Sequence, residues 1–116
     1  METSAELRQV LHPVSNVAAA VDFYAAAFGF GTKFVDGDRY AALDTGAATL
    51  ALAGPEEDLT GGDPAAAIKV GNVEEALRSV VTAGGTVVRQ PELGPHEVRA
   101  VVRDLWGNLV VVYAPA

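Results

Sequence analysis

Few side chains in this sequence have the chemistry needed for catalysis or metal binding. The chain of 116 residues contains no cysteine and two histidines, His12 and His96. It therefore has no thiolate nucleophile, no disulfide and no cysteine-bound metal, and no serine–histidine–aspartate arrangement is visible. The acidic run at residues 56–58 lies in a stretch rich in glycine and proline, where solvation is a simpler interpretation than paired acid–base chemistry.

His12 lies in a segment, residues 6–15, whose alternating side chains predict a β-strand. It shares one face of that strand with Val10 and Val14, whereas Gln9 lies on the other face. We therefore expect His12 to face a helix layer, as a packed or hydrogen-bonded side chain rather than a metal ligand. The second histidine stands alone in a loop and is expected to be solvated.

The elements that position these side chains occur twice. Residues 14–29 match residues 70–85 at an offset of 56, and each copy carries apolar residues at the spacing of one helix face. In each copy the apolar stripe starts after an asparagine, Asn16 or Asn72, whose side chain can cap a helix. We predict helices over residues 17–28 and 73–83, each stopped by glycine.

The repeat predicts an α+β fold built from two βαβββ modules. The first module covers about residues 5–54 and the second about residues 65–116. A linker at about residues 55–64 is rich in glycine, proline and acid. In the later strands of the second module the offset becomes 60, which matches Asp44 with Asp104.

The composition limits the classes of function. Half of the residues are hydrophobic and 20% are charged, which is typical of a packed core. The net charge of −7 argues against a nucleic-acid partner, because phosphate binding needs a basic face. No apolar run approaches the roughly 20 residues that span a membrane, and the N-terminus lacks the basic start of a signal peptide. We expect a cytoplasmic protein with no membrane partner.

Two motifs resemble the vicinal oxygen chelate superfamily, which includes glyoxalase I, extradiol dioxygenases, fosfomycin-resistance enzymes and bleomycin-binding proteins. Residues 14–30 resemble the family's first strand-to-helix segment. Residues 104–109 resemble its penultimate turn, with Leu105-Trp106 where Pro-Asp is usual. The resemblance spans essentially the whole chain as a single domain. It implies two modules forming an open, U-shaped mixed-sheet barrel around a cleft, often completed by dimerisation, so we expect a homodimer.

The resemblance also implies where a divalent metal would bind in the catalytic members. The four ligand positions correspond to Gln9, Ala51, Ala65 and Val111, and we expect these side chains to point at a common centre. Three of them carry no donor atom, whereas a catalytic metal site typically has about three or more protein ligands. We therefore predict no metal and no cofactor.

Strand alternation, with Gln9 pointing inward, yields a set of candidate ligand-binding residues. If Val98, Ala100 and Val102 pack on the helix, then Glu97, Arg99 and Val101 face the cleft, with Arg39 and Ala41 as their counterparts. The full candidate set is Gln9, Leu11, Phe34, Arg39, Ala51, Arg99, Val101, Trp106, Val111 and Tyr113.

Several of these residues have a second interpretation. Tyr113 can cap the end of the barrel, Phe34 can belong to the core, and Trp106 can gate the cleft or pack in a dimer contact. The two arginines can grip a carboxylate or phosphate, or form ion pairs at the rim with Asp36 and Glu97. Gln9 can bind a ligand or form a hydrogen bond with a backbone group. Leu11 is expected to form part of the wall of the cleft.

These features favour a metal-free small-molecule-binding protein of the glyoxalase and bleomycin-resistance type, possible ligands being an antibiotic or a related metabolite. One alternative is an enzyme, namely a lyase, isomerase or oxygenase, that works without the usual metal through Gln9, Arg99 or Tyr113. Another alternative is an interaction module with no ligand. We favour a function without catalysis.

Overall fold

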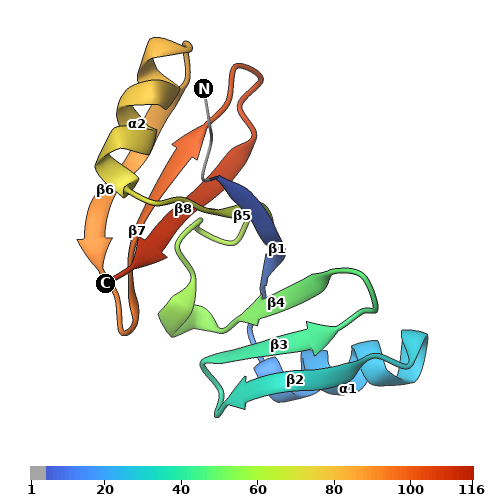
Figure 1. Cartoon of the computed structure of the whole chain (residues 1–116). Helices are drawn as coiled ribbons and strands as arrows, with labels where there is room; N and C mark the ends of the chain where they lie inside the picture. The colour runs from blue at the N-terminus through green and yellow to red at the C-terminus, as the bar shows by residue number, and fades with distance from the viewer. Residues whose placement is uncertain (1–4) are drawn as a thin grey trace. The chain divides into compact units, whose positions relative to one another are not determined.

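The same order of elements appears twice in the computed structural model, which describes residues 5–116 (Figure 1). The first copy consists of β1 (Glu6–Pro13), α1 (Val17–Phe28), β2 (Gly31–Asp36), β3 (Tyr40–Asp44) and β4 (Thr49–Ala53). A short 3-10 turn, η1 (Pro55–Glu57), follows. The second copy consists of β5 (Ala65–Lys69), α2 (Val73–Thr82), β6 (Thr86–Leu93), β7 (Glu97–Arg103) and β8 (Leu109–Pro115). The predicted βαβββ order is confirmed in both copies.

The strands form one mixed sheet in which the strands of each copy are neighbours, and we call these two parts the first and the second sheet. The strand order is β2-β3-β4-β1 in the first copy and β5-β8-β7-β6 in the second. The first and last strands of each copy are parallel, and the other neighbours are antiparallel. The stretch Gln9–Pro64 makes one compact unit, and Ala65–Ala116 makes the other together with the N-terminal end of β1.

Both helices begin at the predicted asparagine caps. The side-chain oxygen of Asn16 accepts from the backbone N–H of Ala19 at 2.9 Å, and that of Asn72 accepts from Glu75 at 2.9 Å. Such caps satisfy N–H groups that have no partner in the first helical turn. The C-terminus of α1 is Gly29 at φ 74°, a left-handed conformation that glycine adopts without a steric penalty.

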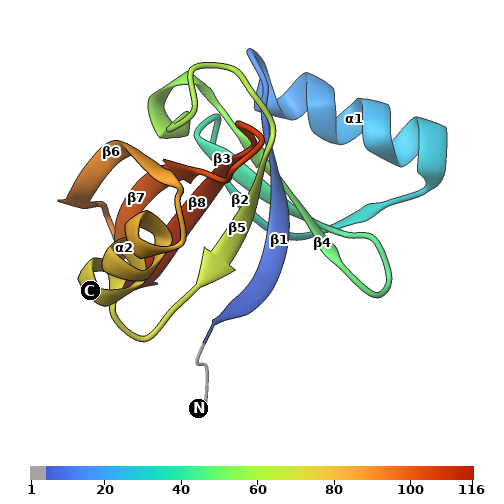
Figure 2. The same cartoon turned by 90° about the horizontal axis from the view of Figure 1, so that it is seen from above.

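Each helix packs on the sheet of its own module (Figures 1 and 2). In the first, α1 packs on β3 and β4; in the second, α2 packs on β6, β7 and β8. The buried residues between helix and sheet are Val17, Ala41, Leu43 and Leu52 in the first module. In the second they are Val70, Val73, Leu77, Ala100, Val102, Val112 and Ala114. No helix in residues 5–116 is long and apolar enough to cross a membrane.

The strand register corrects the predicted match between the third strands of the two modules. Leu43 lies opposite Leu50 in the first module, and Val102 lies opposite Val110 in the second. Val102 is therefore the counterpart of Leu43, and one of the four extra residues of the second module lies in the β7–β8 turn. Asp44 consequently corresponds to Arg103 rather than to Asp104. Sequence alone cannot reveal this shift, because it depends on how long the turn is.

Candidate functional site

In the first module the sheet face opposite α1 has a floor of small side chains. Ala51 is fully buried and lies beside Leu11 in the parallel pair β1–β4. Ala42 lies opposite Ala51, and Phe34 pairs with Ala42. Since paired residues share a face, the predicted residues Leu11, Phe34 and Ala51 lie together with Gln9.

Gln9 and an aromatic pair provide the polar and planar groups of this face. The hydroxyl of Tyr40 donates a long hydrogen bond of 3.4 Å to the side-chain oxygen of Gln9. The Tyr40 ring lies 6.3 Å from the ring of Phe34, measured between centroids, and Phe34 is 57% exposed. This face thus combines hydrogen-bonding groups, an accessible ring and small neighbours, which are the features of an organic-ligand site.

Tyr40 and Ala42 also lie on this face and were not predicted there, because the predicted phase of the strand put their neighbours Arg39 and Ala41 on it. Ala41 is instead fully buried in the core cluster that contains Val17 of α1. The prediction for Ala41 was therefore wrong, and the shifted register of the third strand is the reason. Counting alternation back from Leu43, once its counterpart Val102 is known, would have assigned Tyr40 and Ala42 correctly.

Arg39 forms ion pairs near the start of β3. It pairs with Glu57 of η1, and its guanidinium lies 3.9 Å from both Asp36 and Glu56. The hydrogen bond and charge of Glu57 raise the pKa of Arg39 above its ordinary value. Of the two interpretations of this arginine, the structure shows the ion pair with Asp36.

His12 faces the helix, as predicted. Its Nδ1 lies 3.4 Å from the hydroxyl of Tyr24 on α1, within hydrogen-bond reach. Tyr24 in turn packs against the core cluster of the first module. His12 is therefore a hydrogen-bonded side chain of the helix layer, on the opposite side of β1 from Gln9.

In the second module four predicted residues share the sheet face opposite α2. Val101 lies opposite Val111, and Arg99 lies opposite Tyr113, in the antiparallel pair β7–β8. Ala100 and Val102 belong to the core against α2, so the predicted phase of β7 is confirmed. Val101 and Val111 are both buried.

The polar side chains of this face are partly buried. The guanidinium of Arg99 lies 3.5 Å from the carboxylate of Glu97, and the Arg99 side chain is only 14% exposed. The predicted ion pair with Glu97 is thus present. Burial raises the pKa of the Tyr113 phenol, which keeps this hydroxyl protonated and able to donate a hydrogen bond at neutral pH.

Trp106 lies in the β7–β8 turn, which is held by one carboxylate. Asp104 accepts hydrogen bonds of 2.9 Å from the backbone N–H groups of Trp106 and Asn108, and another of 2.9 Å from the Asn108 side chain. Bonding by Asn108, chiefly through its side chain, lowers the pKa of Asp104. Trp106 is 81% exposed and lines a cavity of about 920 Å³ on the α2 side of the second sheet.

The positions that the family resemblance assigns to metal ligands do not fit a divalent cation. Ala51, Ala65 and Val111 are buried hydrocarbon side chains, and only Gln9 carries a donor atom. Divalent cations in proteins are held by several oxygen, nitrogen or sulfur donors. Within residues 5–116, no three histidine, aspartate or glutamate side chains come together.

Residues 6–112 match the family model of the Glyoxalase/Bleomycin resistance protein/Dioxygenase superfamily. The chain belongs to this superfamily. It is also 39% identical over 110 residues to an uncharacterized protein of Mycolicibacterium smegmatis, covering 95% of this chain and 94% of that one. The predicted family is confirmed.

Several solved structures share the fold. A structure described as NAD-dependent benzaldehyde dehydrogenase from Legionella pneumophila aligns with a TM-score of 0.78 at 19% identity, covering 93% of this chain and 98% of that one. Methylmalonyl-CoA epimerase from Streptomyces coelicolor aligns with a TM-score of 0.72 at 19% identity, covering 99% and 96%. A superfamily member from Vibrio splendidus 12B01 aligns with a TM-score of 0.70 at 16% identity, covering 94% and 99%. These likenesses confirm the α+β class.

Proposed function

We propose that this protein binds a small organic molecule on the sheet faces opposite its helices, and that it does so without a metal. The observation that carries the proposal is the group formed by Gln9, Tyr40 and Phe34 over the small side chains of Ala42 and Ala51. An exposed ring offers stacking area, and the Gln9–Tyr40 pair offers both a donor and an acceptor.

The donor set supports binding without a metal. A superfamily member that uses a metal needs side chains with lone pairs at the four ligand positions, and here three of the four are alanine or valine. Buried hydrocarbon groups suit the apolar part of an organic ligand instead. The ligand we propose has an aromatic ring and a hydrogen-bonding group, as antibiotics and many metabolites do.

Quaternary structure and compartment are part of this proposal. We propose a homodimer, because large apolar side chains such as Phe23, Val35 and Leu93 remain exposed on the described chain. We also propose a cytoplasmic location, which fits the absence of cysteine.

An enzyme that works by proton transfer is the second candidate. Arg99 lies opposite Tyr113, and the half-buried phenol holds its proton at neutral pH, so Tyr113 could serve as an acid and Arg99 could stabilise a developing negative charge. Two of the solved structures of this fold carry enzyme names, an epimerase and a dehydrogenase. Turnover that is lost in Tyr113→Phe would favour this candidate over pure binding.

A ligand panel with matched hydroxyl deletions tests the proposal. A compound that binds the native state raises the melting temperature, and its affinity is then measured by calorimetry. Tyr40→Phe should weaken binding by about fivefold or more, because it removes a hydrogen-bonding hydroxyl from the site. Tyr24→Phe removes the same group on the helix side and should leave the affinity unchanged. Equal effects of the two substitutions would refute a site at Gln9 and Tyr40.

Elemental analysis addresses the metal separately. The purified protein should contain no stoichiometric divalent metal, and adding nickel, zinc, manganese or iron should leave the melting temperature unchanged. A stoichiometric metal, or a rise of several degrees, would overturn the metal-free part of the proposal. A blank result over the whole ligand panel would favour an interaction module.

A further inference from the structure

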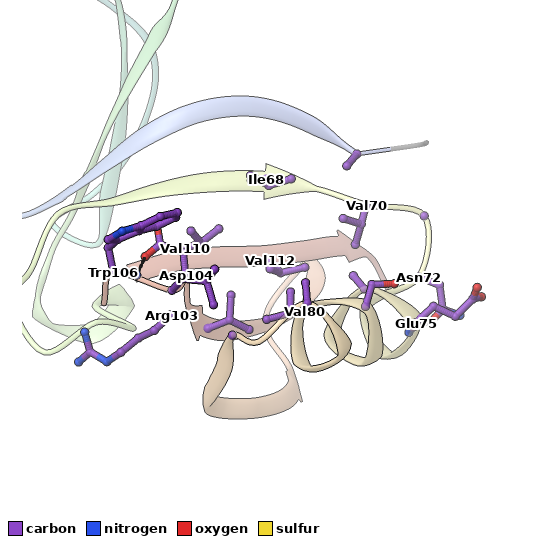
Figure 3. A pocket seen from close by; sticks show the side chains of 18 residues that line it. Ile68, Val70, Asn72, Glu75, Val80, Arg103, Asp104, Trp106, Val110 and Val112 are labelled. Atoms are coloured by element: carbon purple, nitrogen blue, oxygen red, sulfur yellow. Dashed lines mark hydrogen bonds between the residues drawn. The ribbon is translucent and has the colours of Figure 1, made fainter. Parts of the chain in front are cut away.

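The cavity beside Trp106 lies along α2, on the opposite side of the second sheet from Arg99 and Tyr113. Its volume is about 920 Å³, within the range of about 300–1,000 Å³ that is usual for ligand pockets. Figure 3 shows Ile68 of β5 together with Val110 and Val112 of β8 along the sheet, and Val80 of α2 facing them. Trp106 and Asp104 lie at one end and Glu75 at the other. We call this hollow the α2 groove.

The internal repeat explains why the α2 groove is open. Two helix positions carry Phe23 and Tyr24 in the first module, and their counterparts in the second are Ser79 and Val80. The sheet positions beneath them also carry smaller residues in the second module. Leu43, Leu50 and Leu52 correspond to Val102, Val110 and Val112. Every one of these differences removes side-chain volume from the same region.

The first module shows what kind of group occupies this region. The rings of Phe23 and Tyr24 meet edge to face, with centroids 5.1 Å apart. Tyr24 packs on the core cluster, and its hydroxyl reaches His12. The counterpart of His12 is Ile68, so the α2 groove offers no imidazole to a polar group at this point. The groove therefore has space for aromatic rings in a more apolar setting.

Charges around the α2 groove restrict the ligand further. Glu75 and Asp104 both contribute to its lining, and the side chain of Glu75 extends outward at one end of the groove (Figure 3). Arg103 contributes to the lining as well, but its guanidinium donates to the backbone oxygen of Gly107 at 2.8 Å and points away from the groove (Figure 3). An anionic ligand would therefore lie near two negative charges, and among the described lining residues no cation is directed into the groove.

We infer that the α2 groove binds an uncharged, planar aromatic molecule of one or two rings, held between Val80 and the valine floor and stacked against Trp106. This site is distinct from the sheet face that carries Gln9, since its lining residues belong to the other compact unit of the chain. Trp106 contributes a large and accessible ring at the end of the groove, which explains why an aromatic side chain is 81% exposed in this turn.

Fluorescence tests the inference directly, because Trp106 is the only tryptophan in the chain. The uncharged aromatic probe N-phenylnaphthylamine should bind saturably with one site per chain. It should quench the emission of Trp106 as its own emission rises. The related anionic probe anilinonaphthalene sulfonate should bind more weakly, owing to Glu75 and Asp104. Probe binding without any change in Trp106 emission would overturn the assignment.

Two neighbouring residues of α2 provide a matched pair of variants. Val80→Tyr restores the ring that the first module has at this position and should lower the probe affinity by about tenfold or more, because the new side chain occupies the groove. Val81→Tyr adds the same group at a side chain that is 56% exposed and outside the groove, and it should bind like the wild type. Undiminished binding by Val80→Tyr refutes the inference.

A second variant covers the case in which Val80→Tyr does not fold, and a measurement of mass tests for a dimer. If circular dichroism shows that Val80→Tyr does not fold, Val110→Leu is used instead. It introduces the residue that the first module has at this sheet position, and it should also lower the affinity for the probe. Sedimentation tests whether a second copy of the chain occupies the groove instead. A dimer that Val80→Tyr separates and Val81→Tyr preserves would make the groove a subunit interface and overturn the proposal.

Discussion

The hydroxyl of Tyr40 donates a hydrogen bond of 3.4 Å to the side-chain oxygen of Gln9, and this contact joins two strands that are not neighbours in the sheet. Gln9 belongs to β1 and Tyr40 to the start of β3, with β4 between them. The contact crosses the sheet face opposite α1 and brings a polar pair above the alanines of β3 and β4.

A double-mutant cycle measures the role of this pair. Gln9→Ala and Tyr40→Phe should each lower the free energy of unfolding by only about 1 kcal/mol or less, because the bond is long, neutral and half-buried. Ligand affinity should fall as well, by about fivefold or more for Tyr40→Phe. Chemical denaturation and calorimetry on the two single variants and the double variant give both quantities. A loss of several kcal/mol in stability would indicate a structural role for the pair instead.

Truncating the core of the first module should destabilise the protein strongly. Leu52 is fully buried between the sheet and α1, so Leu52→Ala should lower the free energy of unfolding by about 2–5 kcal/mol. Leu7→Ala removes the same atoms from a side chain that is 68% exposed, and its effect should stay within about 0.5 kcal/mol. Urea denaturation followed by circular dichroism gives both values, and similar losses would contradict the described core.

The two helix caps should contribute about equally. Asn16→Ala and Asn72→Ala each remove an acceptor that lies 2.9 Å from a backbone N–H of the first turn. Each substitution should cost about 1 kcal/mol, within a range of about 0.5–2 kcal/mol for such caps. Asn→Gly substitutions at the same positions should cost only a few tenths of a kcal/mol. Denaturant midpoints of the four variants test this prediction. An effect at one asparagine alone would contradict an equal contribution of the two caps.

Asp104 should make stability depend on pH. Its pKa is lowered in the folded chain, so the carboxylate stabilises the native state above its unfolded pKa of about 3.9, and this contribution disappears as the pH falls through the lower native pKa. Asp104→Asn should therefore have a lower melting temperature than the wild type at pH 7, and the difference should shrink in strong acid. Asp22→Asn, on the exposed side of α1, removes the same charge outside the turn and should show no such difference. A difference in melting temperature that persists unchanged in acid would show that the shape of the Asp104 side chain, rather than its charge, stabilises the turn.

Local patterns in the sequence were sufficient to predict the repeating parts of the fold. Alternation on the first strand placed Gln9 and His12 on opposite faces, and the structure places His12 beside Tyr24. The asparagines and the glycine after α1 marked helix ends because capping depends on a few adjacent residues. Each of these predictions depends on atoms that are close together along the chain.

Other features depend on register and on side-chain size across several strands. Tyr40 was missed and Ala41 was assigned to the wrong face because the β7–β8 turn contains one residue more than the β3–β4 turn. The α2 groove was missed for a different reason. It arises from differences in size at aligned positions, such as Tyr24 and Val80, and these emerge only when the two copies are compared after the register is known.

The contrast between Tyr24 and Val80 has a consequence for how doubled proteins diversify. The two halves keep the same order of elements. A cavity can therefore be opened or closed by exchanging large and small side chains while the path of the backbone stays the same. Replacing Phe23 and Tyr24 in the amino-terminal half by smaller residues would be expected to open an equivalent cavity along α1. A duplicated module can in this way acquire two cavities, and the ligand of each can change independently of the other.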